Sequence, residues 1–197
     1  MTTEGPGRVL YFISHPDVVI DPSVPITEWP LSARGRERMA RCCDKPWVAR
    51  LSALYASAER KALDGAGILS AATGLAVHVR PDLGENDRSA TGYLPPSEFE
   101  ATADRFFAEP ETSVRGWTPA VDEQRRIVAA VEAVIAEAPE QGDIAAVSHG
   151  AVGALLLAHL LGEPIGRRFD QPRNGGGNLF AVDAATGALL HGWQPID

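Results

Sequence analysis

The sequence is poor in cysteine and methionine, with two of each in 197 residues. The cysteines, Cys42 and Cys43, are neighbours, and adjacent side chains in a helix point in different directions, which disfavours a disulfide between them. A disulfide-stabilised secreted domain is therefore not expected. The five histidines and two cysteines show no spacing typical of metal ligands, so we expect neither a metal nor any other cofactor.

Basic residues and long apolar runs are also scarce. Lys and Arg total 18 against 26 Asp and Glu, which gives a formal net charge of −8. A surface of this sign repels phosphate backbones, so binding to nucleic acid or to anionic membranes is not expected. No apolar run reaches the length of a membrane span. Residues 1–7 lack the pattern of a signal peptide and are predicted to be a disordered lead-in, so we expect a soluble cytoplasmic protein.

Two histidines each follow a short apolar run rich in β-formers. One run, residues 9–14, precedes His15, and the other, residues 144–148, precedes His149. Short, bounded apolar runs of this kind are typical of buried strands in a parallel sheet. Open α/β sheets bind their ligands at the carboxyl ends of the strands. The two imidazoles are therefore the first candidates for a functional site.

Helical and extended patterns alternate along the rest of the chain, which favours a mostly parallel sheet with helices on both faces. We predict one α/β domain over residues 1–197, a three-layer α/β/α sandwich. A long irregular stretch, Pro81 to Pro96, is typical of a functional loop. The remaining predicted strands cover residues 51–57, 76–80, 178–182 and 188–193, and the predicted helices cover residues 33–43, 59–72, 96–108, 119–138 and 151–161.

Five short motifs occur in order along the chain. They are Ser14-His15-Pro16, the segment Pro30 to Arg36, the segment Ser57 to Ala62, Leu83-Gly84-Glu85, and Ser148-His149-Gly150. In this order they resemble the motifs of the histidine phosphatase superfamily, which includes the cofactor-dependent phosphoglycerate mutases. The family has Arg-His-Gly at the first position, PLTxxGR at the second and SxLxRA at the third. The resemblance covers nearly the whole chain and implies a phosphoglycerate mutase-like fold.

The resemblance also implies an activity, the hydrolysis of a phosphoric monoester of a small phosphorylated metabolite. His15 would attack phosphorus and form a phosphohistidine, and His149 would stabilise charge on the phosphoryl oxygens. Glu85 would protonate the leaving group and then activate water. Lys61, at a position that is usually arginine in the family, would bind the phosphate.

The cations of the family's site are changed in this sequence. Ser14 replaces the first arginine and is itself a candidate phosphate ligand, whereas Pro16 replaces glycine and removes a backbone N–H near the phosphate. Loss of one preorganised donor can lower a rate by roughly 10²–10³. Arg60 and Arg88 are predicted as compensating cations. Arg88 is favoured because its loop should border the same pocket.

Several alternatives stay open at this point. The chain could be a weak or inactive relative that binds a ligand or a protein, or it could carry out phosphoglycerate mutase-like phosphotransfer. The altered pocket could also take a less highly charged substrate, such as a phosphodiester or a non-phosphate ester. Lys61 could be an ordinary solvent-facing charge, and the glycine-rich run 173–178 could be an anion-binding nest or a flexible loop. The sequence leaves the oligomeric state open, including a homodimer.

Overall fold

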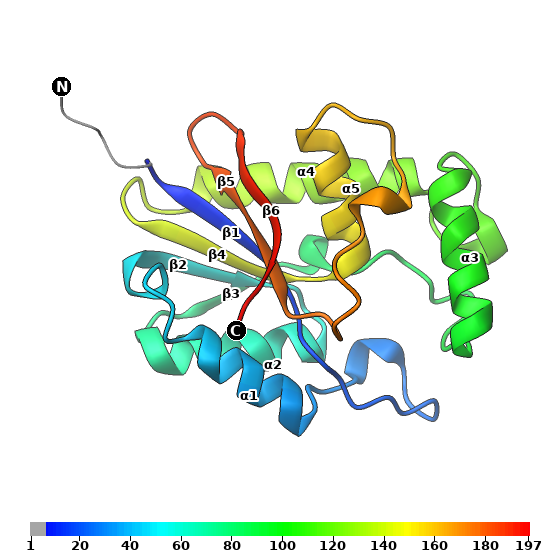
Figure 1. Cartoon of the computed structure of the whole chain (residues 1–197), viewed down its shortest axis with the longest axis horizontal. Helices are drawn as coiled ribbons and strands as arrows, with labels where there is room; N and C mark the ends of the chain where they lie inside the picture. The colour runs from blue at the N-terminus through cyan, green and yellow to red at the C-terminus, as the bar shows by residue number, and fades with distance from the viewer. Residues whose placement is uncertain (1–6) are drawn as a thin grey trace.

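The computed structural model describes residues 7–197, in which six strands form one sheet in the order β3-β2-β4-β1-β5-β6 (Figure 1). The predicted lead-in, residues 1–7, lies outside the described residues except for Gly7. The strands are β1 (Val9–Ser14), β2 (Leu51–Ala56), β3 (Val77–Val79), β4 (Asp143–Ser148), β5 (Asn178–Asp183) and β6 (Leu189–Pro195). The helices are α1 (Ala33–Cys42), α2 (Arg60–Thr73), α3 (Pro96–Ala108), α4 (Ala120–Glu137) and α5 (Gly150–Leu160).

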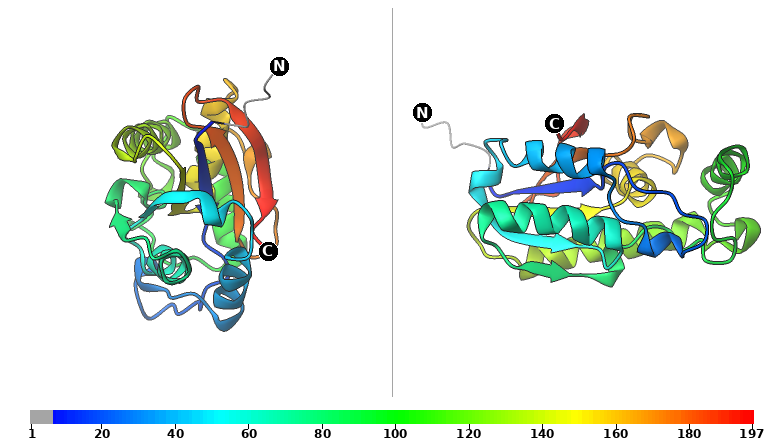
Figure 2. Two further views of the ribbon diagram at one scale, coloured as in Figure 1. Left: turned by 90° about the vertical axis from the view of Figure 1, so that its left-hand side faces the viewer. Right: turned by 90° about the horizontal axis from the view of Figure 1, so that it is seen from below.

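The sheet is parallel from β3 to β1 and antiparallel at β5 and β6. Helices α1 and α2 cover one face of the sheet, and helices α4 and α5 cover the other (Figure 2). The predicted three-layer α/β/α sandwich is therefore confirmed. No helix within residues 7–197 combines the length and the apolar composition that a membrane crossing requires.

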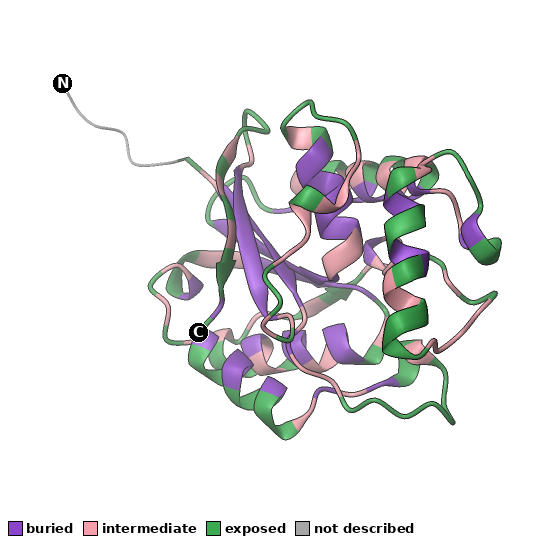
Figure 3. Ribbon diagram, turned by 45° about the vertical axis from the view of Figure 1, so that its right-hand side comes forward, coloured by how far each residue is buried: buried purple, intermediate pink, exposed green. Residues whose placement is uncertain are grey.

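The centre of the sheet is the most buried part of the molecule. Every residue of β1 and β4 is buried (Figure 3). These two strands are parallel neighbours, and their register pairs Ser14 with Ser148. The backbone N–H of His15 donates to the Ser148 carbonyl at 3.1 Å. Because both strands end at this level, His15 and His149 leave the sheet side by side.

Local signals in the sequence account for the helices that flank this edge of the sheet. The Ser32 side chain accepts a hydrogen bond from the Gly35 N–H and so caps α1. Helix α2 ends at Gly74, whose positive φ of 76° closes the last turn. Helix α3 lies off the sheet, on the side toward which β1 and β4 run (Figure 1).

Candidate active site

His15 is held in one orientation by its own loop. Its Nδ1 lies 2.9 Å from the Pro16 carbonyl oxygen, so a proton on Nδ1 is donated there and the lone pair of Nε2 is free. Burial lowers the pKa of His15 to about 4, and the charges of Lys61 and Arg88 act in the same direction. The ring is therefore neutral at physiological pH, which is the state that a nucleophile needs.

His149 lies beside His15, with ring centroids 5.2 Å apart and the planes 70° apart. Its Nε2 is 2.8 Å from Ser57 Oγ and 3.4 Å from the Glu59 carboxylate. Burial, followed by the proximity of His15 and Lys61, lowers the pKa of His149 well below its ordinary value. Its Nδ1 has no hydrogen-bond partner within residues 7–197. The two imidazoles therefore form a neutral pair, in which His149 is fully buried.

Glu85 is fixed against the first turn of α5. Its carboxylate accepts hydrogen bonds from the backbone N–H groups of Val152 at 3.1 Å and Ala151 at 3.3 Å. Burial raises the pKa of Glu85, and the charge of Arg88 opposes this shift. The helix N-terminus also favours the ionised form. A carboxyl group with a raised pKa that can still ionise is suited to give up and regain a proton.

The loop that carries Glu85 is held from α4. Arg126 donates to the carbonyl oxygens of Asp82 at 2.6 Å and Glu85 at 3.1 Å. The buried Glu123 forms an ion pair with Arg126 and accepts the N–H of Asp87 at 2.8 Å. The start of the predicted functional loop is therefore fixed on both sides of Glu85.

Lys61 is buried, with 2% of its surface exposed. Its ammonium donates to the Ile26 carbonyl at 2.9 Å and to the Glu59 carboxylate at 2.5 Å. Glu59 also accepts the backbone N–H of Glu85 at 2.8 Å. Sequence reasoning missed Glu59. The available signal was its place in the segment Ser57 to Ala62, where the family motif has leucine.

Two cavities meet at the loop of Glu85. The first, about 550 Å³, is lined by Ser57 and Glu59 among others, and the second, about 430 Å³, is lined by His15. Aromatic side chains line part of the second cavity, and the residues common to both cavities are Glu85, Asn86 and Arg88. The predicted nucleophile and the predicted acid therefore face one space.

Arg88 and Asn86 are two polar side chains that line both cavities. The Arg88 guanidinium lies 5.1 Å from the centroid of the Phe99 ring and forms no ion pair with any residue from 7 to 197. Asn86 is 4% exposed, and its Nδ2 has no hydrogen-bond partner in the described part of the chain. Sequence reasoning selected Arg88 and missed Asn86, which no motif marked.

The structure does not bring Ser14 and Arg60 to these cavities. Ser14 is fully buried, and its hydroxyl donates to Gln171 Oε1 at 2.5 Å and accepts the Asn178 N–H at 3.1 Å. Arg60 pairs with Asp64 one turn along α2 at 2.9 Å, with about half of its side chain exposed. Ser14 thus closes a buried polar network behind the site, and Arg60 faces away from it.

The glycine-rich run presents its carbonyl groups to a cation. The carbonyl oxygens of Asn174, Gly176 and Gly177 accept hydrogen bonds from the buried Arg38. The N–H of Gly177 donates to the His15 carbonyl at 3.0 Å. An anion-binding nest would present N–H groups instead. The run supports the backbone of His15 from behind.

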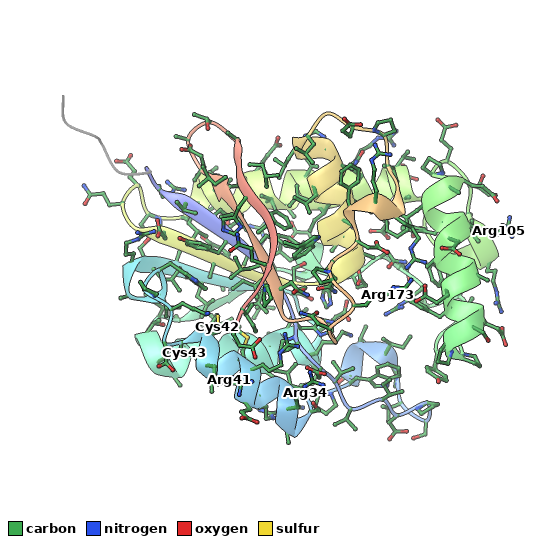
Figure 4. The ribbon with its side chains drawn as sticks, viewed as in Figure 1. Arg34, Arg41, Cys42, Cys43, Arg105 and Arg173 are labelled. Atoms are coloured by element: carbon green, nitrogen blue, oxygen red, sulfur yellow. The ribbon has the colours of Figure 1, made fainter. Side chains whose placement is uncertain are left out.

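Arg173, at the start of that run, reaches toward α3 and lies 3.2 Å from the Glu100 carboxylate (Figure 4).

Cys42 and Cys43 are free thiols at the end of α1, on the helical layer below the sheet (Figure 4). Within residues 7–197 no group of three or more His, Cys, Asp or Glu side chains is arranged to hold a metal ion.

Comparisons with known proteins identify relatives of this fold. Mycobacterial glucosyl-3-phosphoglycerate phosphatase, solved with inorganic phosphate, superposes with a TM-score of 0.77 at 20% identity, covering 96% of this chain and 98% of that one. An Escherichia coli protein described as a candidate alpha-ribazole-5'-P phosphatase gives 0.74 at 18% identity, covering 96% and 98%. YhfR of Bacillus stearothermophilus gives 0.77 at 20% identity, covering 94% and 95%.

No curated protein sequence matches this chain significantly. A family model, however, matches most of the sequence. The match runs over residues 24–191, which includes Glu85 and His149 and begins after His15. On this match, the chain belongs to the histidine phosphatase superfamily, branch 1.

Proposed function

We propose that this protein is a phosphoric monoester hydrolase that acts on a small phosphorylated metabolite through a phosphohistidine at His15. The observation that carries the proposal is the pairing of two neutral imidazoles, 5.2 Å apart, of which His15 lines a cavity together with Glu85 and Arg88. The phosphatases among its structural neighbours support the same reaction class.

The reaction has two steps. His15 Nε2 attacks phosphorus, the bond from phosphorus to the ester oxygen breaks, and Glu85 gives its proton to the departing alkoxide. Water then attacks the phosphohistidine, Glu85 takes a proton from that water, and the bond from nitrogen to phosphorus breaks. Inorganic phosphate leaves and His15 is restored. The aromatic side chains of the second cavity suit an organic leaving group.

Release of inorganic phosphate from a panel of aryl and alkyl phosphomonoesters, compared between the wild type and His15→Ala, tests the proposal. Wild-type turnover no greater than that of His15→Ala on every member of the panel would overturn it. A cytoplasmic location stays a prediction.

Replacing Arg88 with alanine should weaken the binding of inorganic phosphate by roughly 10-fold to 100-fold, because a hydrogen bond to a charged group contributes about 1.5–3 kcal/mol. Arg60→Ala is the matched control, since it removes the same charge from the exposed face of α2. Isothermal titration calorimetry measures both. Equal phosphate affinity in the wild type and Arg88→Ala would show that Arg88 does not compensate for the missing arginine.

Activity should depend on pH through two groups. His15 must be neutral, so kcat/KM should rise as the pH increases through about 4. Glu85 must be protonated in the first step, so activity on an alkyl phosphate should fall as the pH rises above its pKa, which burial raises.

The leaving group provides the control for this pH profile. When the substrate is an aryl phosphate with an acidic phenol, the phenolate leaves without needing a proton. The substitution Glu85→Gln should therefore lower the rate of hydrolysis less for this substrate than for an alkyl phosphate. For each substrate, the pH profile is measured with the wild type and with Glu85→Gln. The ionisation of the substrate then affects both profiles equally and cancels in their ratio. An alkaline limb that persists in Glu85→Gln would assign it to another group.

A further inference from the structure

The Glu59 side chain points into the site and does not cap helix α2, at whose start it lies. Glu59 is the residue before the first turn of α2, where a short polar side chain commonly caps the helix. Its side chain makes no capping hydrogen bond. The carboxylate instead turns into the site and lines the first cavity, with 12% of the side chain exposed.

The donors around this carboxylate are those that a bound phosphoryl group would need. Lys61 Nζ lies 2.5 Å from Oε2, and the backbone N–H of Glu85 donates to Oε1 at 2.8 Å. His149 Nε2 is 3.4 Å from the same Oε1. A carboxylate of the protein therefore already draws on the buried Lys61 ammonium and on the backbone amide, beside the buried imidazole of His149.

The formal charges of the site show what this does to an anionic ligand. Among the charged side chains nearest the two imidazoles, Lys61 and Arg88 contribute two positive charges and Glu59 and Glu85 two negative ones, and both imidazoles are neutral. Arg126, Arg167 and Arg173 are each paired with a carboxylate. In the reacting form, with Glu85 protonated, one net positive charge remains. That charge balances a monoanion and leaves a dianion uncompensated in a partly desolvated space.

We propose that Glu59 sets the charge selectivity of the site, so that singly charged phosphoryl groups bind in preference to dianions. The substrate then binds as the monoanion of its phosphomonoester, and a singly charged phosphodiester competes for the same place. This inference rests on the proposed function, because it assumes that the phosphoryl group binds beside His15 and His149.

The test is the affinity for inorganic phosphate, measured by calorimetry at about pH 5 and about pH 8, on either side of the second ionisation of a phosphoryl group. The wild type should bind phosphate at least about tenfold more tightly at the lower pH. Glu59→Gln keeps the shape and an acceptor oxygen but removes the charge, so it should bind phosphate at about pH 8 roughly tenfold more tightly than the wild type does.

Glu132→Gln is the matched control. Glu132 is an exposed residue of α4, so this variant changes the net charge equally without touching the site. It should bind phosphate as the wild type does. If Glu59 were only the counterion of the buried Lys61, Glu59→Gln would lower thermal stability and leave phosphate affinity at about pH 8 unchanged or weaker, which would overturn the inference.

The other outcomes separate this inference from the proposed function. If Glu59→Gln fails to fold, the two pH values are compared in Glu85→Gln, in which the acid no longer titrates: equal phosphate affinity at the two pH values overturns the inference, and a preference for the lower pH supports it. Charge-selective phosphate binding without hydrolysis of any ester supports the inference and contradicts the proposed function. Hydrolysis of monoesters together with equal affinity for the phosphate monoanion and dianion supports the proposed function and contradicts the inference.

Discussion

Replacing His15 with alanine should abolish turnover of an aryl phosphate, with kcat lowered by roughly 10⁴-fold or more, as for other covalent nucleophiles. The reason is that, among the described residues that line the second cavity, His15 is the one imidazole, and it lies beside His149. The Nδ1 contact with the Pro16 carbonyl leaves only Nε2 to attack, and alanine supplies no nucleophile.

The same variant should lose the covalent intermediate. Rapid quenching of the wild type with a radiolabelled substrate should trap a phosphoryl group that is stable in alkali and labile in acid, as a phosphohistidine is. His159→Ala, which removes an exposed histidine of α5, should retain both turnover and label. A labelled His15→Ala would place the nucleophile elsewhere in the site.

Replacing Gly176 with alanine should lower the free energy of unfolding by about 2–4 kcal/mol. Two costs add. The φ of 77° is a conformation that side chains disfavour, and an alanine Cβ would lie 2.4 Å from the carbonyl oxygen of His15. Since backbone atoms cannot rotate away as a side chain can, one of the two segments must move. Urea denaturation measures the loss.

Gly74→Ala carries only the first of these costs. Gly74 has nearly the same φ, 76°, at the end of α2, and a Cβ there would meet no atom within 4 Å. It should lose only about 1–2 kcal/mol from the backbone conformation. Gly176→Ala should also weaken phosphate binding, because it displaces His15, whereas Gly74→Ala should not. Equal stability losses in the two variants would refute the close approach to His15.

The strand ends could be predicted because their signals are local. The runs before His15 and His149 are short, apolar and bounded, and a parallel sheet brings such ends to one edge. Glu85 was predicted from the resemblance of Leu83-Gly84-Glu85 to the family motif, and Arg88 from its place in the same loop. Local patterns, each within a few residues of the feature concerned, thus predict the six strands, their helices and the pairing of the imidazoles.

The remaining site residues depend on contacts that no local pattern contains. Ser14 turns into a network with Gln171 and Asn178, which lie over 150 positions further along the chain. The burial of Lys61 depends on a carbonyl group in the proline-rich loop and on Glu59. Arg60 is adjacent to Lys61, but successive helical side chains are 100° apart, so one faces the site and the other faces solvent.

The attachment of Glu85 has an evolutionary consequence. Its carboxylate is bound by the first turn of α5, which begins directly after His149, and its backbone is bound by Arg126 of α4. The loop beyond Arg88 shares neither anchor. Insertions and substitutions there can change the leaving group that descendants of this protein accept, while the acid and the imidazole keep their places. The first part of the loop therefore keeps the chemistry constant, and the part that follows it can change the substrate.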